Sequence, residues 1–352
     1  MMFLLARQKK RIRRIWGAIG IALCLLFTAL LSGCAGSSAG AAASGQPEKL
    51  ELRYQGSVGN VTFPELAEDL GYLAPIKLKW IGNTISGPQD IQTAATGDVD
   101  FGGAFNGAIV KLIAAKAPIT AVIGYYGVDQ HTYSGFFVTE DSPIKSPKDL
   151  IGKKVGMNTL GAHHESMLKE YLHRNGLTNE EIKQVTLVVV PPVNTEQSLR
   201  QKQIDVAVLG GILRDKALER GGIRPLFTDY DLFGEFTAGS YVLTNKFIKQ
   251  YPNTAKKFVE ATGKAIEWAR TNPPDVVKAR FEKIIKERGR NEDASNVPYW
   301  KSTGVAGKGG WIAEKEFGVW VDWLVKDGQL KEGQLKAAEL YTNRFSAYPD
   351  GK

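Results

Sequence analysis

The stretch VTLVVVPPVNTEQSLRQKQIDVAVL, residues 185–209, decides the fold class. Its two apolar runs, Leu187–Val190 and Val206–Leu209, show no alternation of polar and apolar residues, which is typical of strands covered on both faces. A helix that starts near Thr195 separates the two runs. Strands that alternate with helices in this way form parallel units. The stretch therefore predicts an α/β fold.

The same order of elements occurs in the first half of the chain. It contains, in this order, a helix over residues 63–70, a strand over 76–81, a helix from Pro88 and a strand around 99–101. The later unit has the same order and begins with a helix over 165–174. Two such units predict two lobes. In an open α/β sheet, ligands bind at the carboxyl ends of the strands, so the loops at those ends are candidate binding loops.

The chain has two segments where it could cross between the lobes. Both are β-prone, residues 132–138 and 239–243, and two crossings make a two-segment hinge. The expected boundaries follow from these crossings: lobe 1 is 49–136 together with 242–352, and lobe 2 is 137–241. The rest of lobe 1 has helical periodicity, with a last pair of helices over 314–326 and 332–341.

The N-terminal residues are typical of an export signal. Six Lys and Arg residues precede an apolar run, Ile15–Leu31, which ends in Leu31-Ser32-Gly33-Cys34. A basic flank, a short apolar stretch and small residues before the cut are the signature of a cleaved signal. The last four residues resemble the lipobox of bacterial lipoproteins, which predicts a signal peptide at 1–33 and a lipid on Cys34. A single transmembrane anchor is the alternative.

Composition excludes several functions for the part after Cys34. Cys24 and Cys34 are the only two cysteines, so that part has no disulfide, thiolate nucleophile or cysteine metal site. Without the six basic residues of the signal, 39 Lys and Arg face 37 Asp and Glu, a net charge of +2. Nucleic-acid binding is not expected, because it needs a clustered basic footprint. Residues 34–48, rich in Gly, Ala and Ser, predict a flexible tether.

Four loops that follow strands combine glycine with small hydroxyl or amide side chains and a helix start. They are Gln55–Asn60, Asn83–Gln89, Gly102–Asn106 and Asn158–His164. The first N–H groups of a helix have no partner within the helix, and the helix dipole adds partial positive charge there. Several such ends that face one cleft could hold an oxyanion. Ordinary helix capping is the alternative for each loop taken alone.

Two further features carry less information. Adjacent helical residues point in different directions, so one of His163 and His164 is expected to face the cleft and the other to lie at the surface. Arg214, which follows Gly210-Gly211, could make a charge-assisted contact to a ligand, or it could be a solvated side chain. No metal site and no cofactor are expected. Nucleophile motifs are absent, so an enzyme is not predicted.

At this point the residues resemble a known family. The run DSPIKSPKDLIGKKV, residues 141–155, resembles the stretch that opens lobe 2 in the aliphatic sulfonate, taurine and nitrate class of ABC-transporter substrate-binding proteins. Residues 97–102, 87–89 and 340–345 are similar to other parts of that family. The resemblance implies a bilobal type II periplasmic-binding-protein fold, with a small oxyanion, chiefly an aliphatic sulfonate, in the interlobe cleft.

The resemblance also implies partners and site residues. It implies a monomer, lipid-anchored through Cys34 on the extracytoplasmic face of the membrane (periplasm or cell surface), that works with an ABC permease and ATPase. Carried over by position, and with Arg214 added from the residues themselves, the expected ligand contacts are Gln55, Ser57, Gly87, Asn106, Thr159, Gly161, His163 and Arg214. One departure is residues 209–214, LGGILR, where many sulfonate binders carry an aromatic motif. A cofactor-free enzyme and a pyrimidine-precursor binder on the same fold stay open as alternatives.

Overall fold

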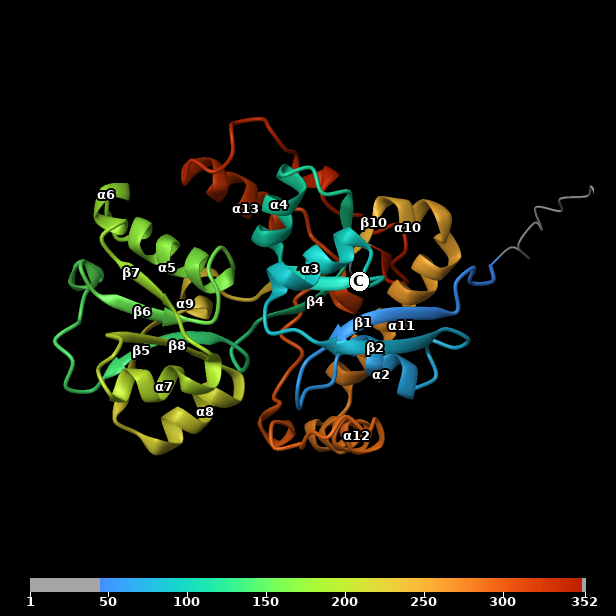
Figure 1. The fold of residues 1–352 in the computed structure, drawn as a ribbon, viewed down its shortest axis with the longest axis horizontal. Coiled ribbons are helices and arrows are strands. Elements are labelled where there is room, and N and C mark those ends of the chain that lie inside the picture. Colours follow the sequence, from blue (N-terminus) through green and yellow to red (C-terminus); the bar gives the residue numbers. More distant parts are fainter. Residues whose placement is uncertain (1–44, 350–352) are drawn as a thin grey trace, which may run out of the picture. The chain divides into compact units, whose positions relative to one another are not determined.

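The computed structural model describes residues 45–349, so the predicted signal peptide (1–33), Cys34 and most of the predicted tether lie outside the described residues. From Pro47 onward the chain forms one unit. It contains ten strands, with helices packed around them (Figure 1). The α/β class predicted from the sequence is confirmed. No helix within 45–349 is both long enough and apolar enough to cross a membrane.

The first lobe contains two small sheets. Strands β1 and β2 form a parallel pair, and β3, β10 and β4 form an antiparallel sheet in that order. The strands of this lobe are β1 (Glu51–Gly56), β2 (Lys77–Asn83), β3 (Gly102–Phe105), β4 (Ile119–Val128) and β10 (Phe236–Thr244). Its helices are α2 (Phe63–Asp69), α3 (Gly87–Thr96), α4 (Asn106–Ala114), α10 (Asn245–Gln250), α11 (Pro252–Thr271), α12 (Pro274–Glu287) and α13 (Lys315–Lys326).

The second lobe is built on one five-stranded sheet with the order β7-β6-β8-β5-β9. Strands β7, β6 and β8 are parallel, whereas β5 is antiparallel to both of its neighbours. The strands are β5 (Ser134–Thr139), β6 (Lys154–Met157), β7 (Thr186–Val189), β8 (Val206–Gly210) and β9 (Ile223–Thr228). The helices are α5 (His163–Arg174), α6 (Asn179–Ile182), α7 (Pro192–Arg200), α8 (Gly211–Arg220) and α9 (Asp229–Phe233).

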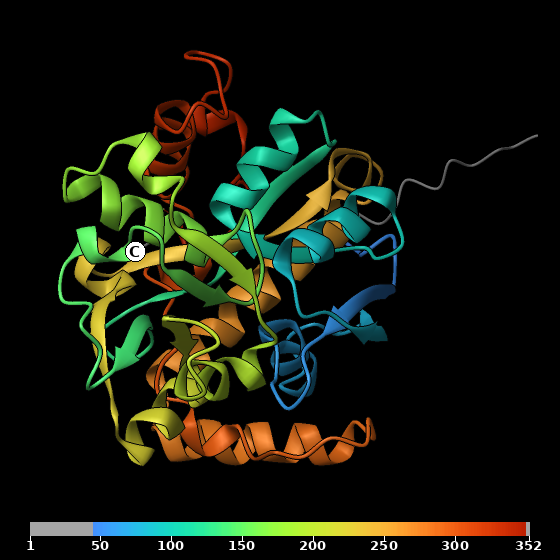
Figure 2. The ribbon, with the colours of Figure 1, turned by 60° about the vertical axis from the view of Figure 1, so that its left-hand side comes forward.

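Helices cover both faces of this sheet, as Figure 2 shows with the lobe turned forward. Alternate residues of β5 point to opposite faces: Phe136 and Val138 pack in the cluster that includes α5, and Phe137 packs in the cluster that includes α7 and α8. The apolar run of β8 is buried, as the sequence predicted. The same prediction is wrong for β7, because β7 is an edge strand and Val189 keeps 57% of its surface exposed.

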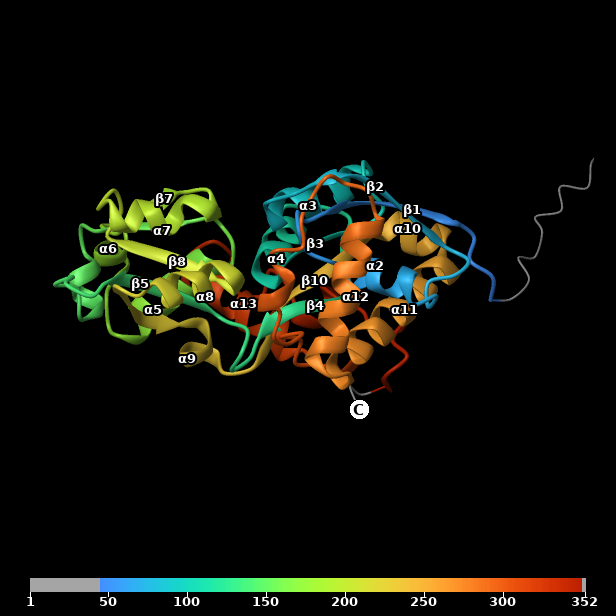
Figure 3. The same cartoon turned by 90° about the horizontal axis from the view of Figure 1, so that it is seen from below.

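The chain crosses between the lobes twice (Figure 3). Strand β4 of the first lobe ends at Val128, and β5 of the second lobe begins at Ser134. The return passage follows α9, which ends at Phe233, and precedes β10. The crossings are therefore residues 129–133 and 234–235, a few residues before the expected segments. Most of the residues expected to form the hinge are paired within β5 and β10 instead.

The last predicted helix, over residues 332–341, is not observed, and only a single 3-10 turn, Ala337–Glu339, forms there. The chain beyond it runs along the edge of β4. Ala121 N donates to Leu340 O over 3.0 Å, and Thr342 N donates to Ala121 O over 2.9 Å. These long-range bonds take the place of the bonds that a helix would have made within the segment.

Candidate ligand-binding cleft

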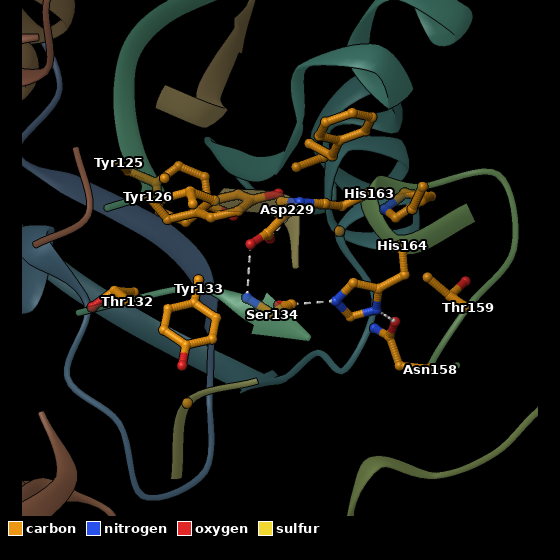
Figure 4. Close-up of a pocket in the computed structure, with 18 residues that line it drawn as sticks. Tyr125, Tyr126, Thr132, Tyr133, Ser134, Asn158, Thr159, His163, His164 and Asp229 are labelled. Atoms are coloured by element: carbon orange, nitrogen blue, oxygen red, sulfur yellow. Dashed lines mark hydrogen bonds and ion pairs between the residues drawn. The ribbon is translucent and has the colours of Figure 1, made fainter. Parts of the chain in front are cut away.

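A cavity of about 320 Å³ lies where the two lobes meet, and we call it the cleft cavity (Figure 4). Side chains from both lobes and from the first crossing line it. The lining residues include Gly87, Phe105, Tyr125, Tyr126, Tyr133, Ser134, Asn158, Thr159, His163, His164, Gly211 and Asp229. Its volume is in the usual range for small-molecule sites, about 300–1,000 Å³.

Four helices begin at the cleft cavity: α3 at Gly87, α5 at His163, α8 at Gly211 and α9 at Asp229. Thr228 caps α9, but none of the other three has a side-chain hydrogen bond at its N-cap. Uncapped helix starts present N–H donors and partial positive charge. Three of them at one cavity form a site suited to an anion.

Gly87 has a steric reason to be glycine. A Cβ at this position would lie 3.0 Å from Ala104 Cα and 3.1 Å from Ala104 Cβ. Real Cβ atoms are seldom this close, so the start of α3 packs against β3 only because the side chain is absent. This close packing brings the first turn of α3 to the wall of the cleft cavity.

The charge of the cleft cavity is unusual for an anion site. Among the described residues that line it, none is Lys or Arg, and Asp229 is a buried acidic group with 1% of its side chain exposed. Asp229 Oδ1 accepts a hydrogen bond from Ser134 N over 2.9 Å, and Oδ2 lies 3.0 Å from His163 Nε2. Positive potential must therefore come from the backbone N–H groups at the helix starts.

His164 also lines the cleft cavity, so the expectation that only one of the two histidines faces it is wrong. The two residues stand at the first turn of α5, at the cavity wall, where neither has a preceding helical turn. His164 Nδ1 lies 3.0 Å from Asn158 Oδ1, and Nε2 lies 3.3 Å from Ser134 Oγ (Figure 4). Because Asn158 Oδ1 only accepts, the imidazole carries its proton on Nδ1, and Ser134 donates to Nε2.

The order of Ser134, His164 and Asn158 is that of a nucleophile, a base and an orienting group. Burial, with a smaller contribution from His163, lowers the pKa of the His164 imidazole to about 3. A general base is most effective when its pKa lies near the operating pH. His164 is therefore too weak a base to activate Ser134, and the arrangement serves as a hydrogen-bonded wall of the cavity.

Aromatic side chains form much of the remaining wall. Tyr125 and Tyr126 lie 4.9 Å apart between ring centroids, and Phe105 lies 5.1 Å from His163. Burial, and the nearby Asp229 carboxylate, raise the pKa of Tyr126, so it stays a neutral phenol. The cleft cavity thus combines polar groups at its helix starts with flat apolar surfaces.

Three of the eight expected contact residues, Gly87, Thr159 and His163, line the cleft cavity. Asn106 does not, because its side chain is fully buried in the first lobe. Its amide nitrogen donates to Thr237 O and Glu316 O, both over 3.2 Å, and its oxygen accepts from Ser240 Oγ over 2.8 Å. Asn106 thus joins β10 and α13 to the start of α4.

Arg214 is also engaged elsewhere. Its guanidinium, 2% exposed, donates to Tyr133 O over 2.8 Å and to His131 O over 3.1 Å, and it lies 3.8 Å from the Tyr133 ring centroid. It also pairs with Asp215 over 2.7 Å. Arg214 therefore holds the first crossing, and its contact with the cavity is indirect, through Tyr133.

The other three expected residues lie outside the cleft cavity as well. Gly161 N donates to Glu165 Oε2 over 2.7 Å. Gln55 accepts from Thr93 Oγ1 over 3.3 Å, and Ser57 Oγ accepts from Asn60 Nδ2 over 3.3 Å.

Ser134 and Asp229 line the cleft cavity as well, although local sequence did not single them out. Asp229 follows Thr228, the N-cap of α9, in a Thr-x-x-Asp capping box whose two hydrogen bonds are both present. That signature predicts a helix start, but not that its first carboxylate would meet a residue 95 positions earlier. Within 45–349, no group of three or more His, Cys, Asp or Glu side chains could hold a metal ion.

Comparison with known proteins identifies the family of the chain. A family model described as NMT1/THI5 like matches residues 65–276. A relative from Escherichia coli (strain K12), named as an aliphatic sulfonates-binding protein, is 30% identical over 198 residues, which are 54% of this chain and 58% of that protein. The match thus spans less than two thirds of that relative.

Two solved structures show the same fold. The periplasmic aliphatic sulphonate binding protein SsuA from Escherichia coli has a TM-score of 0.63 and 19% identity, over 85% of this chain and 93% of that chain. The alkanesulfonate-binding protein SsuA from Xanthomonas axonopodis pv. citri, bound to MOPS, has a TM-score of 0.64 and 16% identity, over 85% and 99%. Both are named as binding proteins. The periplasmic-binding-protein fold is confirmed, and because the family model covers more than half of the chain, the chain belongs to the NMT1/THI5-like family.

Proposed function

We propose that this protein is the extracytoplasmic substrate-binding component of an ABC importer and that it captures a small oxyanion, first of all an aliphatic sulfonate, in the cleft cavity. The observation that carries the proposal is the convergence of three uncapped helix starts, those of α3, α5 and α8, on one interlobe cavity. The names of the sulfonate-binding relatives support it.

Backbone donors do most of the binding in this proposal, because no Lys or Arg is found among the described residues that line the cleft cavity. Each hydrogen bond to a charged group contributes about 1.5–3 kcal/mol net. A sulfonate accepts several such bonds, so helix starts assisted by Thr159 can reach micromolar affinity, about 8 kcal/mol. The Asp229 carboxylate accepts a hydrogen bond from Ser134 N and lies 3.0 Å from His163 Nε2, so both of its oxygens have neighbours within the protein.

A pyrimidine precursor is the second candidate, and the aromatic wall favours it. Tyr125, Tyr126 and Phe105 offer flat surfaces to a ring. Asn158 and Asp229 could pair with the ring's polar edge. A pyrimidine ligand needs no anionic group, so the charge of the ligand that binds distinguishes this candidate from the oxyanion.

Location and partners belong to the same proposal. The mature protein would be held at the outer face of the membrane by a lipid on Cys34, and it would act as a monomer. Closure of the lobes about the two crossings would present the loaded protein to a permease and its ATPase, as hinge closure does in binding proteins.

Thermal unfolding with a small ligand panel tests the proposal. Ethanesulfonate at about 100 times its Kd should stabilise the native protein by about 2.7 kcal/mol, because it binds only the folded state. Taurine, nitrate and 4-aminopyrimidine complete the panel. Stabilisation by 4-aminopyrimidine and by no oxyanion would replace the proposal with the second candidate.

A further inference from the structure

A second cavity, of about 260 Å³, adjoins the cleft cavity, and we call it the side chamber. The two cavities share four lining residues: Tyr125, Tyr126, Thr132 and Gly211. Shared walls on several sides make them neighbouring compartments of one cleft. The side chamber is also lined by Gly59 and Asn60 and by residues between 296 and 303.

Gly211 stands at the junction of the two compartments. A Cβ at this position would meet no atom within 4 Å, so the space beside the start of α8 is open. Its φ of +53° lies in the left-handed region that favours glycine. The backbone therefore turns here with no side chain in the passage.

The side chamber differs from the cleft cavity in its chemistry. Its wall is largely aromatic and aliphatic, with Phe63, Phe281, Trp300, Val61 and Ile212 among its members. Phe281 and Trp300 make an edge-to-face pair with ring centroids 5.8 Å apart.

One charged residue, Lys301, is found among the described residues that line the side chamber. Its Nζ lies 2.8 Å from Asp215 Oδ2, and Arg214 pairs with the other oxygen of that carboxylate over 2.7 Å. Lys301 is thus engaged in an ion cluster. The chamber suits an uncharged group that can stack on aromatic side chains.

We infer that the ligand has two parts: an acidic head group at the helix starts of the cleft cavity, and an aromatic tail in the side chamber. This inference rests on the proposed function and extends it to a substrate class, arylalkyl sulfonates. An apolar cavity of about 150 Å³ is enough to bind benzene, so the side chamber holds one ring. Burying a ring of the size of a Phe side chain should tighten binding at least about tenfold.

Titration calorimetry with two probes, methanesulfonate and 2-phenylethanesulfonate, tests the inference. The native protein should bind 2-phenylethanesulfonate at least tenfold more tightly. Ile212 lines the side chamber only, so Ile212→Trp should fill it and abolish that preference, while the Kd for methanesulfonate changes less than threefold. Leu218→Trp is the matched control: it adds the same side chain to an exposed site on α8, outside both cavities, and should keep the preference.

Val61→Trp fills the chamber from the other lobe and replaces Ile212→Trp if that variant does not fold. Equal affinity of the native protein for the two probes would overturn the two-part ligand while leaving sulfonate binding intact. A preference that survives both Trp variants would also overturn it. If neither probe binds, the proposed function itself fails, and the two-part ligand fails with it.

Discussion

Two segments look alike in the sequence, but the structure uses them differently. Gly102–Asn106, expected to be a loop, forms strand β3 and the first residue of α4, whereas Asn158–His164 is the loop that follows β6 together with the start of α5. Gly102–Asn106 and Asn158–His164 both bring small polar residues to a helix start. The second presents Thr159 and His163 to the cleft cavity. The first buries Asn106 completely, where it bonds to β10 and α13. A polar residue at a helix start can thus either line a binding cavity or stabilise the fold. Which of the two it does depends on its partners far along the chain.

The largest expected effect is on stability. Asn106→Ala should lower the free energy of unfolding by about 3 kcal/mol or more, because it leaves buried donors and acceptors without partners, each costing about 1–3 kcal/mol. Asn158→Ala is the matched control in the other loop. Asn158 bonds to the half-buried His164, so this change should cost about 1 kcal/mol. Urea unfolding of both variants measures the difference, and equal losses would remove the distinction between the loops.

Arg214→Ala sharpens the same comparison for a charged residue. The loss of hydrogen bonds to two backbone carbonyls and of the stack on Tyr133 should cost about 2–3 kcal/mol of stability. Arg214→Lys should not restore it, because an ammonium cannot reproduce the planar, multidentate contact. A variant of native stability with strongly reduced ligand affinity would show instead that Arg214 serves the ligand.

Acid should destabilise the protein through His164. The pKa of this histidine is about 3 in the folded protein and about 6.5 in the unfolded chain. The folded protein holds this imidazole in its neutral form, whereas the unfolded chain protonates it below pH 6.5. The free energy of unfolding should therefore fall by about 2 kcal/mol between pH 7 and pH 5. Burial raises the pKa of Glu316 to about 7, which acts in the opposite direction.

Comparison with His164→Gln isolates the histidine, because Glu316 is present in both proteins. Unfolding free energies at pH 7 and pH 5 should show a larger loss for the native protein than for the variant. Identical changes in the two proteins would mean that His164 titrates normally and is accessible to water.

The smallest effect on stability is expected at Thr159, whose hydroxyl lies at the cleft cavity and makes only a 3.5 Å bond to Leu160 O. Thr159→Ala should change stability by no more than about 0.5 kcal/mol, as a surface substitution does. The affinity for ethanesulfonate should fall about tenfold, which is the value of one modest bond to a charged group. Unchanged affinity by calorimetry would place the head group away from the start of α5.

Local sequence was enough for the order of most strands and helices. It placed two helix starts within two residues: Pro88 was expected where α3 begins at Gly87, and Glu165 where α5 begins at His163. The capping box Thr62-x-x-Glu65 is the kind of feature that local sequence can show, because its hydrogen bonds lie within four residues. Long-range features could not be read in this way. The edge position of β7 and the extended pairing of residues 340–342 with β4 depend on partners far along the chain.

The same limit applies to the candidate site. The loop Asn158–His164 was recognised, since glycine, amide and hydroxyl residues precede a helix. Asp229 and Ser134 were missed because they meet only when α9 packs beside the first crossing. Asn106 was assigned to the ligand because its partners, 131 and 210 residues later, cannot be foreseen from its neighbours.

A crystal structure of the protein with ethanesulfonate would show whether helix starts in the cleft cavity hold the anion. We expect the sulfonate to lie in the cleft cavity, with its oxygens within about 3 Å of backbone N–H groups in the first turns of α3, α5 or α8. Thr159 Oγ1 should be the nearest hydroxyl. A sulfonate held chiefly by a Lys or Arg side chain, or bound outside the space between the lobes, would contradict the account.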